Sequence, residues 1–587
     1  MKHKLLLFFT LITTFLQAQG FNQYDRLWST YVGGNGLDFP MIVKDNNGNI
    51  IVVGSISTSD FSFQNSVYRE YYQSFIYPEN NLMMFQSNDY YVSFITKFSP
   101  NGTLIKASYF PFSITDIVTK NNKIIIRGIT KRRDLGTANV WFTEPNINWN
   151  RAMNLITTLD NDFNTIWTSY LPINYNNISL FDMDEEGNIY GTGSTNINNG
   201  ITTGSTFYPE FTSIDNDLHS GNGLIFKLNS NGQLVWSTYY GMSEILSIKY
   251  HNDKLYIIAN KINLLNDSTA FPWITENAYQ TTQAYSTLAR FNPSNGQREL
   301  ATYYGESDKL TLSHIEVNND AIYIAGDTSI FSDNTPFITS NSYQSVFGGG
   351  SLDYYLAKLD LNFNPIWGTY IGETETDLME FETKNLHFFN NHLYLADATR
   401  STNISLTENT FRSTNAGNYD LLIMKFNPYG QLVWGSFYGS NGIEDLSSLL
   451  PIDDETFYLA GLTDSPKDIT TPNSYQQYYS YLPNNGDFGQ LFLAKFGRND
   501  DLSTSDISTS TLKIYPNPTK DKVYIKGFIH QDSLIEVYNL VGQIISNQKT
   551  KSGLIQTIDV QFLPKGMYII KAIDINGKVF QEKLIKE

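Results

Sequence analysis

The most regular feature of the chain is a unit of strand, polar turn and aromatic strand that recurs over most of its length. Residues 425–439 read Lys-Phe-Asn-Pro-Tyr-Gly-Gln-Leu-Val-Trp-Gly-Ser-Phe-Tyr-Gly, and residues 227–241 are nearly the same text. Apolar runs on both sides of a cluster of turn formers are typical of two paired β-strands. The Trp position of the unit recurs at Trp28, Lys106, Trp167, Trp236, Leu300, Trp367 and Trp434.

Two further strands precede each of these units. An apolar strand, a polar turn and a second apolar strand recur at residues 42–54, 117–128, 181–193, 248–259, 315–326, 386–396 and 450–461. A period therefore holds about four strands, which is typical of a β-propeller blade. The sequence predicts an all-β protein with a seven-bladed β-propeller over residues 20–497. A parallel β-helix, with its shorter periods, is the alternative.

The two ends of the repeat region complement each other. The first aromatic strand, residues 26–33, lacks its three preceding strands, and the last period, residues 446–497, stops before its aromatic strand. We expect Trp28 and Tyr31 to fill that vacancy and to close the ring, which removes an exposed sheet edge.

Variable segments lie between the second and third strands of each period. They are rich in Tyr, Phe, Asn, Ser and Pro, and they span residues 57–90, 130–150, 195–222, 260–283, 328–352, 399–419 and 464–489. Such segments are expected to form rim loops, the usual place for binding on a scaffold. An Asn-x-Tyr-Gln text recurs within them at residues 277–280, 341–344 and 473–476, and its fixed place in the period favours a structural role.

Composition and charge indicate where the protein is located and which classes of partner it can bind. Residues 1–19 combine two lysines, a short apolar run and small residues, the pattern of a secretory signal peptide; the run is shorter than the ~20 residues that span a membrane. The chain has no cysteine, which excludes disulfides and thiolate sites. The formal net charge of −18 repels phosphate backbones, so no nucleic-acid partner is expected.

No motif in the chain specifies catalysis or a cofactor. The seven histidines are scattered, and only His387 and His392, around a predicted hairpin turn, lie close enough in sequence to suggest a metal pair. Acidic turns at residues 45–49 and 160–164 are similar to calcium loops but lack the bidentate Glu, which favours ordinary turns. Asp38, Asp308, Asp377 and Asp445 follow the aromatic strands and could form a carboxylate ring or cap turns.

The repeats resemble the SBBP-type β-propeller repeat. The resemblance is carried by Trp28-Ser-Thr-Tyr-Val-Gly33, by the turn Asp45-Asn-Asn-Gly-Asn49 and by Gly193-Ser-Thr195. It extends over residues 22–497 and implies a fold only, because the family has no established common activity.

The end of the chain reads as a different domain. Residues 498–511 are polar and low in complexity, as in a flexible linker, and residues 512–587 alternate as short strands that could form a small β-sandwich. This tail resembles the type A sorting domain of the type IX secretion system of Bacteroidetes. The matching positions are Pro516, Asn517, Pro518, Gly542, Gly566, Tyr568, Gly577 and Lys578, whereas Asn539 departs from the family's Asp.

That resemblance implies export through the type IX machinery by residues 512–587, followed by release or attachment to the cell surface. Together, these features predict a secreted or cell-surface, non-catalytic propeller that binds a glycan or a surface protein through its rim loops. The alternative is an extracellular polysaccharide hydrolase or lyase with carboxylate catalysis at the propeller's channel mouth. No cofactor is predicted, and calcium at an acidic turn is the one metal considered.

Overall fold

The computed structural model describes seventeen stretches of the chain. It describes residues 24–35, 40–55, 93–145, 152–174, 181–211, 221–261, 271–306, 309–331, 337–375, 377, 385–479, 489–498, 513–526, 534–539, 543–549, 555–573 and 579–587. Contacts between Cα atoms divide the chain into two compact units, Met1–Asn499 and Asp500–Glu587. The described part contains no helix that could cross a membrane.

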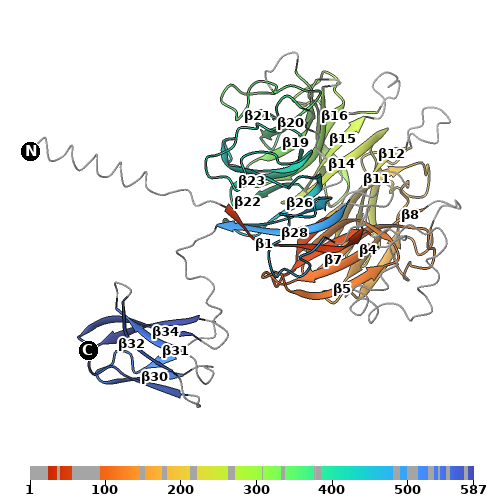
Figure 1. Ribbon diagram of the computed structural model, residues 1–587. Helices are drawn as coiled ribbons and strands as arrows, with labels where there is room; N and C mark the ends of the chain where they lie inside the picture. The colour runs from red at the N-terminus through yellow and green to blue at the C-terminus, as the bar shows by residue number, and fades with distance from the viewer. Residues whose placement is uncertain are drawn as a thin grey trace, which may run out of the picture. The chain divides into compact units, whose positions relative to one another are not determined.

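The described residues of the first unit form seven four-stranded antiparallel sheets (Figure 1). The first sheet contains β2 (Met41–Lys44), β3 (Ile50–Ser55), β4 (Ser93–Phe98) and β5 (Leu104–Phe110). The second contains β6 (Ser113–Lys120), β7 (Lys123–Thr130), β8 (Met153–Leu159) and β9 (Thr165–Tyr170). The third contains β10 (Phe181–Met183), β11 (Ile189–Thr195), β12 (Asn222–Leu228) and β13 (Leu234–Tyr239).

The remaining four sheets repeat this order. The fourth contains β14 (Ser243–His251), β15 (Lys254–Lys261), β16 (Ser286–Asn292) and β17 (Gln297–Tyr304). The fifth contains β18 (Leu310–Val317), β19 (Ile322–Thr328), β20 (Asp353–Leu359) and β21 (Pro365–Ile371). The sixth contains β22 (Leu386–Phe389), β23 (His392–Thr399), β24 (Asp420–Phe426) and β25 (Leu432–Tyr438). The seventh contains β26 (Glu444–Pro451), β27 (Thr456–Thr463), β28 (Gln490–Arg498) and β1 (Tyr24–Asn35).

The second and third strands of these sheets are buried on both faces. In β11, β19 and β24 every residue is buried. Apolar, β-branched and small residues predominate in these strands, which suits this environment because neighbouring sheets cover both faces of the strand. The prediction of an all-β chain built from four-stranded sheets is therefore confirmed for the described residues.

The first strands of successive sheets contact one another around a complete circuit. The contacts run from β2 to β6, β10, β14, β18, β22 and β26, and from β26 back to β2. Side chains reinforce several steps: Ile42 N donates to Ser448 Oγ at 3.2 Å, and Tyr250 N donates to Asp182 Oδ2 at 2.8 Å. The step between the seventh and first sheets thus uses the same kind of bond as an internal step.

Strand β1 occupies the fourth place of the seventh sheet, beside β28, although more than 450 residues separate their sequences (Figure 1). Trp28 pairs with Lys495, and the register shifts next to this pair. Trp236 pairs with Lys227, and Trp367 with Lys358, next to the same irregularity in their sheets. A shared bulge position means that β1 is paired in the register of an ordinary fourth strand.

The described part of the second unit contains two antiparallel sheets. One consists of β29 (Lys513–Tyr515), β30 (Lys522–Lys526) and β33 (Ile555–Asp559). The other consists of β32 (Ile544–Lys549), β31 (Leu534–Tyr538), β34 (Gly566–Ile573) and β35 (Val579–Lys586). Val523 and Ile558 of the first sheet join Val537, Ile570 and Leu584 of the second in one buried apolar cluster.

Two sorting-motif positions, Asn517 and Tyr568, make hydrogen bonds within this unit, and those of Asn517, which follows β29, reach the last described strand, β35. Asn517 Nδ2 donates to Lys583 O at 2.6 Å, and Ile585 N donates to Asn517 Oδ1 at 2.8 Å. The Tyr568 hydroxyl donates to Pro564 O at 2.9 Å. Gly542, Gly577 and Lys578 lie outside the described residues, as do residues 1–19 and most of the predicted linker.

Candidate functional site

The two acidic turns considered for calcium have the bonding pattern of Asx turns. Asp45 Oδ1 accepts hydrogen bonds from Asn47 N and Asn49 N, both at 2.9 Å, and Oδ2 accepts from Asn49 Nδ2. Asp160 repeats these bonds within its own turn. Lys97 Nζ also lies 3.2 Å from Asp45 Oδ2, and the hydrogen bonds hold the pKa of Asp45 below its usual value against the opposing effect of burial. The Asp45 carboxylate is therefore already bound by the N–H groups of its own turn and by the Lys97 ammonium group.

The acids proposed as a ring behave differently from one another. Asp377 is fully buried, and it accepts hydrogen bonds from Thr399 Oγ1 at 2.5 Å and Ser401 Oγ at 2.8 Å. Asp445 is half-buried on β26. Asp38 and Asp308 lie outside the described residues. The bonds of Asp377 fasten two chain segments, so its carboxylate is committed to structure and does not face solvent.

A second buried carboxyl group lies next to Asp377. Asp353, at the start of β20, accepts a hydrogen bond from Gly348 N at 2.7 Å, whereas its Oδ1 atom has no hydrogen-bond partner among the described residues. Burial, aided by the negative charges of Asp377 and Glu373, raises the pKa of Asp353 to about 7. A Cβ atom added at Gly372 would lie 2.3 Å from Asp353 Oδ1, so only glycine fits between the acids.

The next repeat contains a matching pair, Asp420 and Glu444. Glu444 Oε1 accepts a hydrogen bond from Thr463 Oγ1 at 2.5 Å, whereas Asp420 Oδ1 is buried and has no hydrogen-bond partner among the described residues. Gly439 lies against both carboxyl groups, as Gly372 does in the preceding repeat. Burial raises the pKa of both acids, and the charge of Asp420 adds to the effect on Glu444. Burial is thus the main cause of the raised pKa values in both pairs.

A chain of charges crosses the first strands of four adjacent sheets. Lys249 of β14 lies 2.9 Å from the Glu316 carboxylate of β18, and His387 Nδ1 of β22 lies 3.9 Å from the same oxygen. The charges of Glu316 and Asp182 together raise the pKa of Lys249, although burial opposes them. Sequence reasoning missed this chain because the four residues come from four different periods.

The two histidines considered as a metal pair have separate partners. His387 faces Glu316, whereas His392 Nδ1 lies 3.0 Å from Asn390 O. Across the described residues, no three His, Asp or Glu side chains come together in an arrangement that could hold a metal ion. The geometry gives these histidines no shared site.

The repeated tryptophans clamp neighbouring sheets. The Nε1–H group of Trp167 donates to Ser230 O at 3.0 Å, and that of Trp236 donates to Pro293 O at 2.8 Å, in the third-to-fourth strand turn of the next sheet. A glycine of the same turn lies against each indole ring. Trp28 makes the equivalent bond to Pro100 O, at 3.1 Å, with Gly102 against its ring. The clamp between the seventh and first sheets is thus of the common type.

The segments expected to form rim loops dock on the fourth strand of their own sheet. Thr30 Oγ1 accepts a hydrogen bond from Gln476 N, and Thr302 Oγ1 accepts one from Gln280 N, both at 2.8 Å. Gln344 N bonds to Thr369 Oγ1 in the same way. The Asn-x-Tyr-Gln segment therefore covers the edge of the fourth strand. The recurring Thr of the Trp-x-Thr-Tyr pattern could have predicted this contact, because its hydroxyl accepts the hydrogen bond from the Gln backbone.

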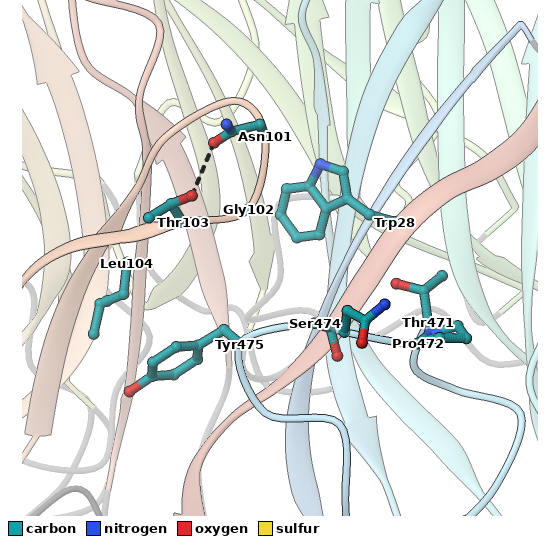
Figure 2. Close-up of a pocket in the computed structure, with 10 residues that line it drawn as sticks. Trp28, Asn101, Gly102, Thr103, Leu104, Thr471, Pro472, Ser474 and Tyr475 are labelled. Carbon is teal, nitrogen blue, oxygen red and sulfur yellow. Dashed lines mark hydrogen bonds between the residues drawn. The ribbon is translucent and has the colours of Figure 1, made fainter. Parts of the chain in front are cut away.

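The seam between the seventh and first sheets contains a cavity of about 410 Å³ (Figure 2). Three segments surround it: β1, through Trp28; the turn between β4 and β5; and the segment before Gln476. Its lining residues are Trp28, Asn101, Gly102, Thr103, Leu104, Thr471, Pro472, Asn473, Ser474 and Tyr475. All are uncharged, and aromatic rings alternate with amides and hydroxyls, so the cavity is suited to binding and has no acid, base or nucleophile pair for catalysis.

The tail matches a known protein family. Residues 513–587 match the secretion system C-terminal sorting domain. The chain carries a sorting domain at its C-terminal end. This domain implies handling by the type IX secretion system and a location on the cell surface or in the medium.

One curated protein is similar over a short stretch. The ulvan lyase NLR42 of Nonlabens ulvanivorans is 32% identical over 84 residues, which are 14% of this chain and 16% of that protein. The chain thus matches about one sixth of its relative's length. The match is close in length to the sorting domain, and the activity in the relative's name does not transfer through it.

Solved structures with similar folds have low scores. One is a protein of unknown function from Dyadobacter fermentans, with 9% identity and a TM-score of 0.36. Another is BamB from Moraxella catarrhalis, with 10% identity and a TM-score of 0.30. Each match covers 81% of this chain and 99% of the other chain. A PL25 ulvan lyase bound to a GlcA–Rha3S glycan covers 74% of this chain and 92% of its own, with 10% identity and a TM-score of 0.35. At these scores the likenesses carry no argument about function.

Proposed function

We propose that the protein is an exported, seven-bladed β-propeller that acts as a non-catalytic binding protein on the cell surface or in the medium. The sorting-domain match over residues 513–587 is the observation that carries the proposal. In this reading residues 1–19 direct export across the inner membrane, residues 20–497 form the propeller, and residues 498–511 link it to a β-sandwich sorting domain at 512–587.

Three features support the propeller. The seven sheets follow one another in sequence, their first strands contact in a closed circuit, and β1 completes the seventh sheet in the register of a fourth strand. Pairing with the N-terminal strand covers the edge of β28, which is an advantage for a protein that must remain soluble outside the cell. Trp28 and Tyr31 are the closing residues in this proposal.

The state of the acids supports binding over carboxylate catalysis. Asp377, one of the four acids considered for a carboxylate ring, is fully buried and hydrogen-bonded to Thr399 and Ser401. A general acid or nucleophile must reach its substrate, and neither member of the Asp353–Asp377 pair is exposed.

The test uses the full chain in a bacterium with a type IX system. We expect the protein outside the cell, and we expect a variant without residues 513–587 to accumulate inside the outer membrane. The purified protein should retain glycans or surface proteins on arrays and in pull-downs, and it should leave polysaccharides, ulvan included, uncleaved. Cleavage that disappears in Asp377→Asn would contradict the proposal, as would export without the tail.

A further inference from the structure

The five repeat tryptophans differ in exposure. Trp167, Trp236, Trp367 and Trp434 are 3–7% exposed, whereas Trp28 is only half-buried. Trp28 donates its indole hydrogen bond to the next sheet's turn, as Trp167, Trp236 and Trp367 do, whereas Trp434 donates to Asn409 O of its own sheet, so the exposure of Trp28 does not come from a missing clamp. It comes from the cavity that opens on the Trp28 ring at the seam between the seventh and first sheets (Figure 2).

At internal seams, equivalent space is filled by the neighbouring segment. Trp141 N donates to Gly232 O at 2.8 Å, and Phe207 N donates to Gly296 O at 3.1 Å, which draws these segments onto the next sheet's turn. The ring of Trp141 packs on Phe226, and that of Phe207 packs on Phe291. Tyr475 packs on Phe98 in the corresponding way, yet it remains 37% exposed.

The cavity presents its groups from a fixed frame. The Trp28 ring is held by Pro100 O and Gly102, and the 471–475 segment is tied to β1 through Ser29 N and Thr471 Oγ1, 3.0 Å apart. Ser474 Oγ is buried and has no hydrogen-bond partner among the described residues. A buried hydroxyl without a partner costs free energy, which a ligand hydroxyl could recover.

We propose that this cavity binds one neutral sugar residue of a glycan. A pyranose ring has an apolar C–H face and a rim of hydroxyl groups. The rings of Trp28 and Tyr475 provide electron-rich faces for the C–H face of the sugar. Ser474, Asn473 and Asn101 provide hydrogen-bond donors and acceptors for its hydroxyl groups. The volume of about 410 Å³ falls within the range of small-ligand sites.

The class of glycan follows from charge. The lining contains no Lys or Arg to pair with a sulfate or a carboxylate, and the whole chain carries a net charge of −18. Sulfated and uronic-acid polymers are therefore disfavoured relative to neutral ones. This inference rests on the proposed binding function and specifies its ligand.

The test measures binding of neutral, sulfated and uronic-acid oligosaccharides to the full chain by calorimetry, with array screening to choose the neutral probe. We expect binding of a neutral oligosaccharide that weakens at least tenfold in Tyr475→Ala. Tyr475→Phe, which keeps the ring, should stay within threefold of the parent protein. Tyr478→Ala is the matched control, because Tyr478 lies on the same segment, is 79% exposed and does not line the cavity.

Each other result has a distinct meaning. Neutral-glycan binding that is unchanged in Tyr475→Ala overturns the cavity assignment and leaves the binding function standing. Preference for sulfated or uronic-acid probes, or retention of a surface protein with no glycan bound, overturns the ligand class. Failure to retain any glycan or protein overturns both this inference and the proposed function.

Discussion

The seam at Trp28 and the seam at Trp236 have the same design and different degrees of closure. Both place a tryptophan opposite a lysine at a strand irregularity, and both clamp the indole to the next sheet's turn. Trp236 is 3% exposed, whereas Trp28 is half-buried beside a cavity. The indole hydrogen bond is thus the same at both seams, whereas a cavity lies beside the tryptophan at the Trp28 seam.

The residue that begins the third strand differs among the sheets. Asp353 and Asp420 occupy this position in the fifth and sixth sheets, each opposite a threonine of the second strand. The seventh sheet has the neutral Gln490 there, opposite Thr463, and Gln490 Nε2 donates to Gly33 O at 2.9 Å. The position is also neutral in the first, third and fourth sheets, so buried acids at this position distinguish the fifth and sixth sheets from both seams.

The largest expected effect comes from truncating the clamps. We expect Trp236→Ala to lower the free energy of unfolding by about 4 kcal/mol, since a fully packed ring leaves a cavity. Trp28→Ala should cost only about 2 kcal/mol, because part of its ring already faces open space. Urea unfolding of the full chain measures both. Tyr429→Ala, at a side chain that is 78% exposed, is the control and should change little. Equal costs at the two tryptophans would erase the distinction between the seams.

A smaller effect concerns pH. The pKa of Asp353 is raised to about 7 by burial and by its acidic neighbours, so the proton is bound more tightly in the folded state than in the unfolded chain. Its contribution to stability is complete below about pH 4 and is lost as pH rises toward 7. Asp353→Asn should therefore flatten the decline in unfolding free energy between pH 5 and 8, by roughly 2 kcal/mol.

The control for the pH measurement is Glu408→Gln, which removes an exposed acid. Its pH profile should follow that of the parent protein. A parent protein whose stability rises from pH 5 to 8, or an Asp353→Asn profile that matches the parent's, would show that folding does not raise the pKa of Asp353.

Much of the architecture could be predicted because strand, turn and period are local signals. The aromatic strand expected at residues 26–33 lies within β1 (Tyr24–Asn35), and the two strands expected at residues 248–259 coincide with β14 (Ser243–His251) and β15 (Lys254–Lys261). In the tail, the polar strand β32 (Ile544–Lys549) was missed, because it has exposed or half-buried residues throughout and lacks an apolar face.

The candidate site was harder to predict, since its parts are distant in sequence. The cavity is lined by Trp28 together with residues near 102 and 473. The carboxyl pair consists of Asp353, at the start of β20, and Asp377, which precedes the sixth sheet. Only the pairing of β1 with β28 brings the first set together. Sequence patterns predicted the pairing of residues 26–33 with the last period, and β1 does pair with β28, but they could not reveal the cavity at this seam.

Closure by β1 is the central claim, and an engineered disulfide tests it most directly. The chain has no cysteine, and Ser29 and Ala494 are directly opposed, buried partners on β1 and β28. The Ser29→Cys/Ala494→Cys protein, refolded with oxidant, should form an intramolecular disulfide and lose both free thiols. Ser29→Cys/Ala357→Cys is the matched control, because Ala357 lies at the equivalent third-strand position of the fifth sheet. Disulfide formation no faster than in the control would contradict closure.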